Sequence, residues 1–467
     1  MISEPMERNV ILIILDTVRK DYFDKFAERI QDKSQTSFEQ CRAAASWSTP
    51  SHASILTGQL LHQHGVHSGN QSFDEIDVGE TFLNQLSDHD KLCLTDHGLL
   101  QPDYGFDKFF DRHRTTGWEH IVNNADLDAG VEKYLIALKE TLASGDPFTM
   151  YKNVERALWN DLEDLMFKLP VSGPPDQGAA ELSRIAKEET GQAEEPFFIF
   201  MNFMDAHTKH RVHKNLDHSL HSAPDDWSSE SHYVWESDEF EESYVDHYRD
   251  LYGASIDYLD RIVVDLYEYV SKETDTETTV LITADHGHNL GYPYDEDLLG
   301  HMGSMTESVL HVPLSIINPP EGFPKKVDNY FSQLELGELI VQIANNESRV
   351  DNLTGSPIVA EHEGLVGYRE KENNFPGTDE EFEYWNRMMR AHYDNRTKYI
   401  WDILGNIQKY KLMFDDPCYQ ELVEERSGNL DDESEFFNVG MEEYRRQLKT
   451  RTVDNAVMED LEDLGYL

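Results

Sequence analysis

Short apolar runs that alternate with longer amphipathic stretches mark most of the chain. Residues 9–15 (NVILIIL) are continuously apolar and rich in β-branched side chains, which is typical of a strand buried on both faces. Similar runs recur at 91–95, 197–203, 278–283 and 312–317. The stretches between them predict helices at 127–143, 154–168 and 244–270. Strands alternating with helices predict an α/β fold, with a large, mostly parallel sheet sandwiched between helices.

The pattern changes beyond residue 350. Short strand-like runs with tight connections follow at 399–403, 409–414 and 421–423, and they predict a small antiparallel sheet. The polar stretch 209–238, rich in His, Ser and Asp, predicts a long surface insertion. We therefore expect a large α/β domain over 1–350, a small C-terminal α+β subdomain over 351–440 and a charged helical tail over 441–467.

The excess of acidic residues bears on the binding partners of the protein and on the salt concentration in which it works. The 467 residues include 40 Lys and Arg against 90 Asp and Glu, a formal net charge of -50. A duplex-DNA binder needs cationic contacts to phosphates, so nucleic acid is excluded as a partner. The acidic excess runs along the whole chain and predicts a solvated acidic surface, whose self-repulsion dense counter-ions would screen in a high-salt cytoplasm. An ordinary acidic protein is the alternative.

Cysteines and targeting segments add little. Cys41, Cys93 and Cys418 are too few and too scattered for a disulfide framework or a cysteine zinc cage. The first residues show no basic segment before an apolar stretch with a cleavage site. No run approaches the roughly 18 apolar residues of a membrane span. These observations predict a cytoplasmic protein without a transmembrane segment.

Acidic residues stand directly after three of the predicted strands. They are Asp16, Asp205 and Asp285, with His207 and His286 close by in the sequence. In an open α/β sheet, ligands bind beyond the carboxyl ends of the strands. Any one of these Asp residues could cap a helix instead. Together, carboxylates and imidazoles at one edge favour a divalent cation, with zinc or manganese preferred to calcium.

The stretch 46–58 (SWSTPSHASILTG) carries a candidate nucleophile. Pro50 suits the first turn of a helix, and Ser48 stands just ahead of it. A hydroxyl there lies near the unpaired backbone N–H groups of the helix, where a tetrahedral anion would also bind. Contact with a metal would help the hydroxyl to lose its proton and become a nucleophile. The alternative is a Ser that only caps the helix, and the spacing leaves both open.

Several segments, in order along the chain, resemble the sulfatase family of the alkaline-phosphatase superfamily. Residues 48–58 (STPSHASILTG) are similar to its signature, in which a Cys or Ser that is oxidised to formylglycine precedes x-P-S-R-x-x-x-x-T-G. The other similar segments are ILDTVRKDYF at 14–23, FIFMNFMDAH at 198–207, ITADHGHNLG at 282–291 and GHMGSMTESVLHVPLSI at 300–316. The resemblance covers about residues 8–345 and implies an alkaline-phosphatase-like fold. The acidic composition fits a haloarchaeal member.

The resemblance also implies roles for individual residues. The implied metal ligands are Asp16, Ser48, Asp285 and His286. Ser48 matches the nucleophile, and Asn70 matches an Asn that binds a non-bridging oxygen of the substrate. His207 matches a His that contacts the ester or leaving-group oxygen. His301 matches a residue that faces the sulfate or phosphate, or a ligand of the second metal in two-metal relatives.

Three departures from the family pattern bear on the chemistry. His52 stands where the signature has its Arg and is the implied substrate-binding residue there. Asp16 and Thr17 replace an Asp-Asp pair, and residues 94–111 hold no G-K-W-H-L-G segment. These departures favour an unmodified Ser48 that attacks phosphorus, with conversion to formylglycine as the alternative.

The residue at position 209 bears on whether the site holds one metal ion or two. Asp205 and His301 could contribute to a second site, but Lys209 stands where two-metal relatives often have a His. A protonated Lys cannot help to hold a cation. We therefore expect one divalent ion (manganese, zinc, magnesium or calcium), with a second possible, and we expect His207 and His301 to donate hydrogen bonds to the developing charge.

The predicted function is a metal-dependent hydrolase of sulfate or phosphate esters that uses Ser48 as nucleophile. Its substrate would be a small-molecule or glycan ester. A transferase that passes the group to an alcohol acceptor is one alternative, and a catalytically silent binding protein is another. The joint presence of Asp16, Ser48, Asp285 and His286 favours an enzyme. A further His group (His62, His64 and His67) could line the mouth of the pocket, but solvated polar surface is the preferred interpretation. His288 is not expected to be a ligand.

Overall fold

The computed structural model describes most of the chain. The described residues are 7–116, 176–229, 235–236, 240–348, 356–366, 377–428 and 436–448, together with 354, 375 and 430. The helices predicted at 127–143 and 154–168 lie outside the described residues, as does the predicted domain boundary at residue 350.

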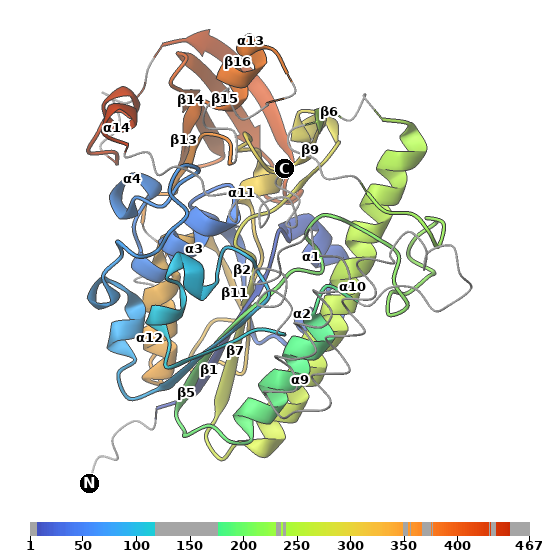
Figure 1. The fold of residues 1–467 in the computed structure, drawn as a ribbon, viewed down its shortest axis with the longest axis vertical. Helices are drawn as coiled ribbons and strands as arrows, with labels where there is room; N and C mark the ends of the chain where they lie inside the picture. Colours follow the sequence, from blue (N-terminus) through green and yellow to red (C-terminus); the bar gives the residue numbers. More distant parts are fainter. Residues whose placement is uncertain are drawn as a thin grey trace, which may run out of the picture.

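A large sheet forms the centre of the molecule (Figure 1). Its eight strands have the order β11-β2-β10-β7-β1-β5-β3-β4. Their bounds are β1 (Asn9–Leu15), β2 (Thr36–Arg42), β3 (Asp90–Thr95), β4 (Arg112–Arg114), β5 (Phe197–Phe203), β7 (Thr278–Thr283), β10 (Leu314–Ile317) and β11 (Lys326–Ser332). β1 runs parallel to both neighbours, β5 and β7, while β10 is antiparallel to β7 and β2. The prediction of a mostly parallel sheet is confirmed.

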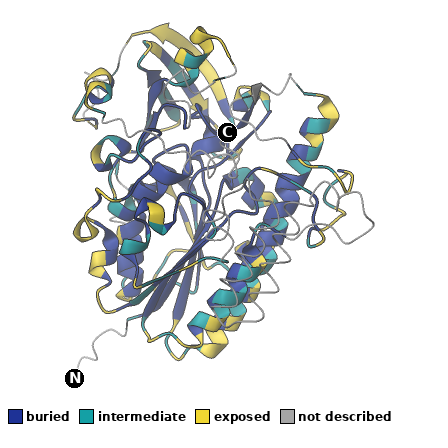
Figure 2. Ribbon diagram, in the orientation of Figure 1, coloured by how far each residue is buried: buried dark blue, intermediate teal, exposed yellow. Residues whose placement is uncertain are grey.

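The apolar runs explain why these strands lie in the middle of the sheet. Every residue of β1, β5 and β7 is buried, because helices cover both faces (Figure 2). The strand predicted at 312–317 begins two residues later, at Leu314. β2 and β11 were not predicted, since their alternating polar positions on outer strands lack the continuous apolar signature.

Two groups of helices cover the sheet (Figure 1). One face carries the 32-residue helix α10 (Glu242–Glu273), which contacts α1 (Lys20–Phe26), α2 (Glu28–Lys33) and α9 (Ala179–Thr190). The other face carries α3 (Ser48–Thr57) and α12 (Leu336–Ala344), with α4 (Leu61–His64) beside α3. α10 confirms the helix predicted at 244–270. Within the described parts of the chain, no helix combines the length and apolar character that a membrane span requires.

The C-terminal sheet is antiparallel and separate, as predicted. Its five strands are β12 (Val359–Glu363), β13 (Met388–Asp394), β14 (Thr397–Asp402), β15 (Asn406–Leu412) and β16 (Gln420–Ser427). The sheet lies beyond the end of the large sheet at which α3 and α4 are found, and its outermost strand is exposed (Figures 1 and 2). The remaining strands and α-helices of the described residues are β6 (Trp235–Glu236), β8 (Asn289–Leu290), β9 (Leu298–Gly300), α11 (Glu307–Leu310), α13 (Asp379–Trp385) and α14 (Met441–Gln447).

Candidate active site

The carboxyl ends of β1 and β7 bring two acidic residues together. Asp16 follows β1 and Asp285 comes two residues after β7, so adjacent parallel strands deliver both to the same edge of the sheet. His286 is next in the chain. One ligand atom from each of these three buried residues lies within 4.8 Å of the other two. The arrangement is a possible metal site.

The electrostatics of this cluster fit a divalent cation. Burial, with Asp285 adding to it, raises the pKa of Asp16 well above its usual value. Burial would also raise the pKa of Asp285, but His286, His52 and two backbone N–H groups outweigh it and hold that pKa below normal. Asp16 Oδ1 and Asp285 Oδ2 have no hydrogen-bond partner among the described residues. Buried, unpartnered carboxylate oxygens are what a cation would stabilise.

His286 presents the correct nitrogen for a metal. Its Nδ1 lies 2.9 Å from the Gly287 carbonyl oxygen, which can only accept, so Nδ1 carries the proton. The lone pair is therefore on Nε2, 3.4 Å from Asp285 Oδ2. A carbonyl that fixes the tautomer in this way is a common support for metal-binding histidines.

Ser48 lies at the start of α3 and faces the same cluster. The helix begins at Ser48 with Trp47 as its N-cap residue, and no side chain caps its first turn. The buried Ser48 Oγ lies 3.2 Å from His286 Nε2. Of the two interpretations of Ser48, this geometry favours a residue of the metal cluster and disfavours a residue that only caps the helix.

His52 lies one turn further along α3. Its Nδ1–H donates to the Ser48 carbonyl oxygen at 2.8 Å, and the same nitrogen is 3.8 Å from Asp285 Oδ2. Burial lowers the pKa of His52, against the opposing effect of Asp285, so the ring is neutral. The Arg position of the signature thus holds an uncharged imidazole whose ring packs 5.7 Å from that of Phe200.

Two polar residues beside the cluster were missed from the sequence. Asn202, within β5, donates from Nδ2 to Asp16 Oδ2 at 3.2 Å. His97, two residues after β3, accepts the Leu99 N–H at Nδ1, so its Nε2 carries the proton and lies 3.9 Å from Asp16 Oδ2. An Asn inside an otherwise apolar strand and a His at a further strand end were the available signals.

His207 and His301 also lie close to the cluster. The ring centroid of His301 is 4.4 Å from that of His286 and 5.5 Å from that of His207. His207 Nδ1–H donates to the Thr208 carbonyl oxygen at 2.7 Å, and burial lowers its pKa to about 4. The neutral ring therefore has its lone pair on Nε2, which accepts hydrogen bonds. This differs from the expected role of His207 as a donor.

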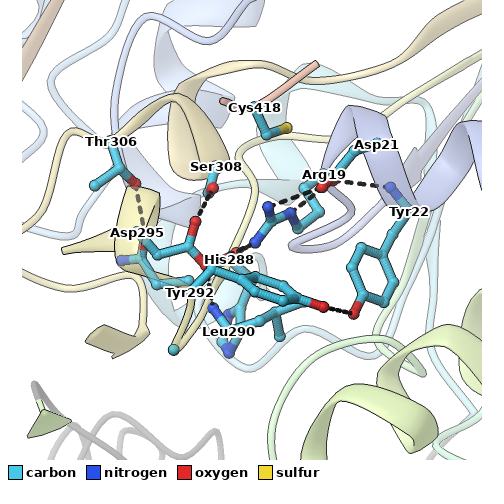
Figure 3. A network of polar contacts seen from close by, with 12 residues as sticks. Arg19, Asp21, Tyr22, His288, Leu290, Tyr292, Asp295, Thr306, Ser308 and Cys418 are labelled. Atoms are coloured by element: carbon cyan, nitrogen blue, oxygen red, sulfur yellow. Dashed lines mark hydrogen bonds and ion pairs between the residues drawn. The ribbon is translucent and has the colours of Figure 1, made fainter. Parts of the chain in front are cut away.

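A buried polar network holds the loops after β1 and β7 in place (Figure 3). Arg19 donates from Nη1 to the His288 carbonyl oxygen and to Asp295 Oδ2, both at 3.0 Å, and from Nε to Asp21 Oδ1 at 2.7 Å. The His288 ring joins Tyr248 Oη (2.6 Å) to His301 Nδ1 (3.3 Å). The network ties the loop after β1 to the loop after β7, so the ends of both strands keep a fixed separation.

Two other predicted residues make hydrogen bonds with backbone groups outside the cluster. Asn70 donates from Nδ2 to the Gly65 carbonyl oxygen at 3.0 Å and so bonds within its own loop. Asp205 accepts the backbone N–H groups of Gln177 (3.0 Å) and Ala179 (3.2 Å) at the start of α9, which is a capping role. Of the three strand-end Asp residues, therefore, two belong to the cluster and one caps a helix.

The prediction for the His group at 62–67 is wrong. His64 and His67 are buried, and the side chain of His62 is 2% exposed. Two of the three contact acidic residues of β12. His62 Nδ1 lies 2.7 Å from Glu361 Oε2, and His67 Nδ1 lies 3.3 Å from Glu363 Oε2. Contacts between residues about 300 apart in the sequence therefore bury this polar loop against β12.

Comparisons with known proteins identify the family and the fold. The sulfatase family model matches residues 8–346, while no curated protein matches the chain. The phosphonate monoester hydrolase of Agrobacterium radiobacter superposes with a TM-score of 0.58 at 14% identity, covering 86% of this chain and 89% of that chain. A protein solved with its substrate D-glucosamine-2-N,6-O-disulfate gives 0.55 at 12% identity, covering 87% and 91%.

A 2-O GAG sulfatase gives a TM-score of 0.52 at 14% identity, covering 98% of this chain and 90% of that chain. At such identities these similarities establish the shared fold. The family match spans the whole large sheet and every residue of the cluster. The chain therefore belongs to the sulfatase family and is a hydrolase of sulfuric or phosphoric esters.

Proposed function

We propose that the protein hydrolyses its ester at one divalent metal ion, with Ser48 as the nucleophile. The observation that carries the proposal is the position of Ser48 Oγ, buried at the start of α3 and 3.2 Å from His286 Nε2. Asp16, Ser48, Asp285 and His286 would hold the ion. When bound, it would supply positive charge that lowers the pKa of the Ser48 hydroxyl and polarises the substrate.

The side chains around Ser48 suit the two steps of the reaction. Ser48 Oγ attacks phosphorus or sulfur, the bond to the departing alcohol breaks, and the proton lost by the Ser48 hydroxyl passes to that alcohol. Water then attacks the serine ester and releases the inorganic ion. The backbone N–H groups at the start of α3 and the Nε2–H of His97 are donors for the tetrahedral group. His207 Nε2, with its lone pair, is a base for the water step.

The described residues favour one ion. Among them, the Asp16–Asp285–His286 group is the one set of His, Cys and acidic side chains with ligand atoms this close together. Asp205, which a second site would need, caps α9. His in the set favours zinc or manganese.

We further propose that phosphate esters are preferred. His52 is neutral in the position where the family signature has a charged Arg, which favours an unmodified Ser48. A serine phosphate can be released by water attack at phosphorus. A serine sulfate lacks the hemiacetal route by which a formylglycine hydrate expels sulfate.

The test combines kinetics with mass spectrometry. Values of kcat/KM are measured at high salt for p-nitrophenyl phosphate, bis-p-nitrophenyl phosphate and p-nitrophenyl sulfate, with Ser48→Ala as control, and the mass of the Ser48 peptide is determined. We expect an unmodified peptide and faster phosphate turnover, abolished in the variant. Sulfate turnover with a peptide two hydrogen atoms lighter would instead establish formylglycine. Unchanged activity in Ser48→Ala would refute the nucleophile.

A transferase differs only in the acceptor of the second step. Adding a simple alcohol such as glycerol to the assay and measuring the phosphorylated product separates a transferase from a hydrolase.

We also propose a glycan or small-molecule ester as substrate, which the disulfated glucosamine bound by one structural relative supports. We propose further that the protein works in a salt-rich cytoplasm of the haloarchaeal kind, as its net charge of -50 suggests. A silent binding protein would bind inorganic phosphate without any turnover.

A further inference from the structure

β12 of the C-terminal sheet lies against the segment that leads to Ser48. The Glu361 N–H donates to the Ala44 carbonyl oxygen at 3.0 Å, and Glu361 forms a parallel bridge with Ala45. Two buried acidic residues secure the strand. Glu361 accepts from Arg390 Nε at 2.9 Å, and Glu363 accepts from Ser68 Oγ at 2.8 Å. β12 therefore has a fixed place beside the nucleophile segment.

His362 lies between these two acidic residues, and side chains alternate along a strand, so its ring points to the opposite face of β12. The ring is fully buried, and its Nδ1 is 2.8 Å from Ser46 Oγ. Ser46 is two residues before Ser48. The C-terminal sheet thus places His362 against the segment that leads into α3 and carries Ser48.

The tautomer of His362 can be assigned. Burial, with Arg387 next, lowers its pKa to about 3, so the ring is neutral at pH 7. Among the described residues, the Ser46 hydroxyl has no other hydrogen-bond partner than His362 Nδ1. The hydroxyl hydrogen therefore goes to Nδ1, because a buried hydroxyl without an acceptor is unfavourable. The ring proton is then on Nε2, which has no partner among the described residues.

We propose that His362 Nε2–H donates a hydrogen bond to an oxygen of the bound ester, so that the C-terminal sheet supplies a substrate-binding group. The inference rests on the proposed function. A buried N–H donor without a protein acceptor is accounted for if the substrate provides one. The His62–Glu361 and His67–Glu363 contacts would then help substrate binding, because they hold in place the strand that carries His362.

The test is a set of variants assayed for p-nitrophenyl phosphate hydrolysis. His362→Leu removes the donor and should raise KM about tenfold, with kcat within about twofold of the wild-type value. His362→Gln places an amide N–H near the position of Nε2 and should restore KM to within about threefold. Ser46→Ala removes the group that sets the tautomer and should also raise KM.

The matched control is His392→Leu, on the neighbouring strand β13, where the ring packs 4.7 Å from Phe436. It should leave KM and kcat unchanged. The inference is overturned if His362→Leu keeps the wild-type KM. It is also overturned if the Leu and Gln variants lose activity and melting temperature equally, as a packing role would require. Wild-type protein that hydrolyses no ester would overturn the proposed function, and this inference with it.

Discussion

Asp16 and Asp285 lie close together in a buried site, and their pKa values shift in opposite directions. Burial raises the pKa of Asp16, whereas His286 and His52 outweigh burial at Asp285 and lower its pKa. Two carboxylates this close strongly disfavour double ionisation unless a cation compensates. The charge of Asp285 is therefore the feature on which the proposed metal binding would depend most directly.

Replacing Asp285 with Asn should remove the metal. The amide keeps the shape of the side chain but loses the charge, so bound metal should fall to trace levels and kcat/KM by at least about 1000-fold. Metal content is measured by elemental analysis of the purified protein. The matched control is Asp205→Asn, at the other strand end, where the carboxylate caps α9. That variant should keep its metal. Full metal content in Asp285→Asn would contradict the assignment.

At the scale of elements, the loop after β7 is held so closely that Gly287 has no room for a side chain. A Cβ at this position would overlap the Ser308 carbonyl oxygen and come within 3.1 Å of Arg19 Cβ. Both neighbours lie in or beside the network that joins the loops after β1 and β7. The lack of a side chain at Gly287 is therefore part of the architecture of the candidate active site.

Gly287→Ala should consequently lower both stability and metal affinity. We expect a loss of about 2–4 kcal/mol in the free energy of unfolding, measured by chemical denaturation, since backbone must move to make room. Gly191→Ala is the matched control, because its added Cβ would meet nothing closer than 3.6 Å. Equal stability of the two variants would show that the loop after β7 adapts easily.

The contact between β12 and the large domain depends on a buried acid. Burial would raise the pKa of Glu363, but His67, Arg445 and Ser68 outweigh it and lower that pKa to about 2. A lowered pKa contributes stability above the ordinary value of 4.5, and that contribution disappears as the pH falls from 4.5 towards about 2.

Glu363→Gln should therefore destabilise the protein at neutral pH by on the order of 2–3 kcal/mol. The difference from the wild type should shrink below about pH 4.5, where the wild-type carboxylate loses its advantage. Urea denaturation between pH 7 and pH 3 gives the comparison. Glu421→Gln, on the exposed strand β16, is the control and should match the wild type throughout. A difference that is constant with pH would point to packing instead of charge.

At the scale of the whole molecule, the excess of acidic residues is the dominant feature. With a formal net charge of -50, self-repulsion opposes the compact state wherever counter-ions are scarce. The screening length grows from about 3 Å at 1 M salt to about 30 Å at 0.01 M. When the salt is diluted, each acidic side chain is therefore repelled by many more of the others.

The melting temperature should therefore fall steadily as potassium chloride is reduced from molar to millimolar concentrations. Differential scanning calorimetry over such a series makes the measurement. Sucrose at matched osmolality is the control, because it alters hydration without screening charge. A midpoint that stays constant, or rises on dilution, would exclude salt adaptation.

Much of the fold followed from local sequence. The runs at 9–15, 197–203 and 278–283 became β1, β5 and β7 with unchanged bounds, because a strand covered on both faces needs apolar residues at every position. Outer strands such as β2 and β11 carry polar residues at intervals, so their sequences resemble loops. The sequence also predicted the edge of the sheet at which Asp16 and Asp285 meet, because parallel strands end at the same edge.

The direction of each polar side chain was decided by tertiary structure. Asp205 and Asp285 both follow a buried strand. Asp205 caps a helix because it accepts a backbone N–H at the start of α9, a segment that its own local sequence does not reveal. His62 and His67 resemble solvated surface until two acidic residues of β12 pack against them. His362 contacts Ser46, which is far away in sequence and lies two residues before Ser48. Hydrophobic periodicity is local and therefore readable, whereas the partner of a buried polar group depends on how distant segments meet.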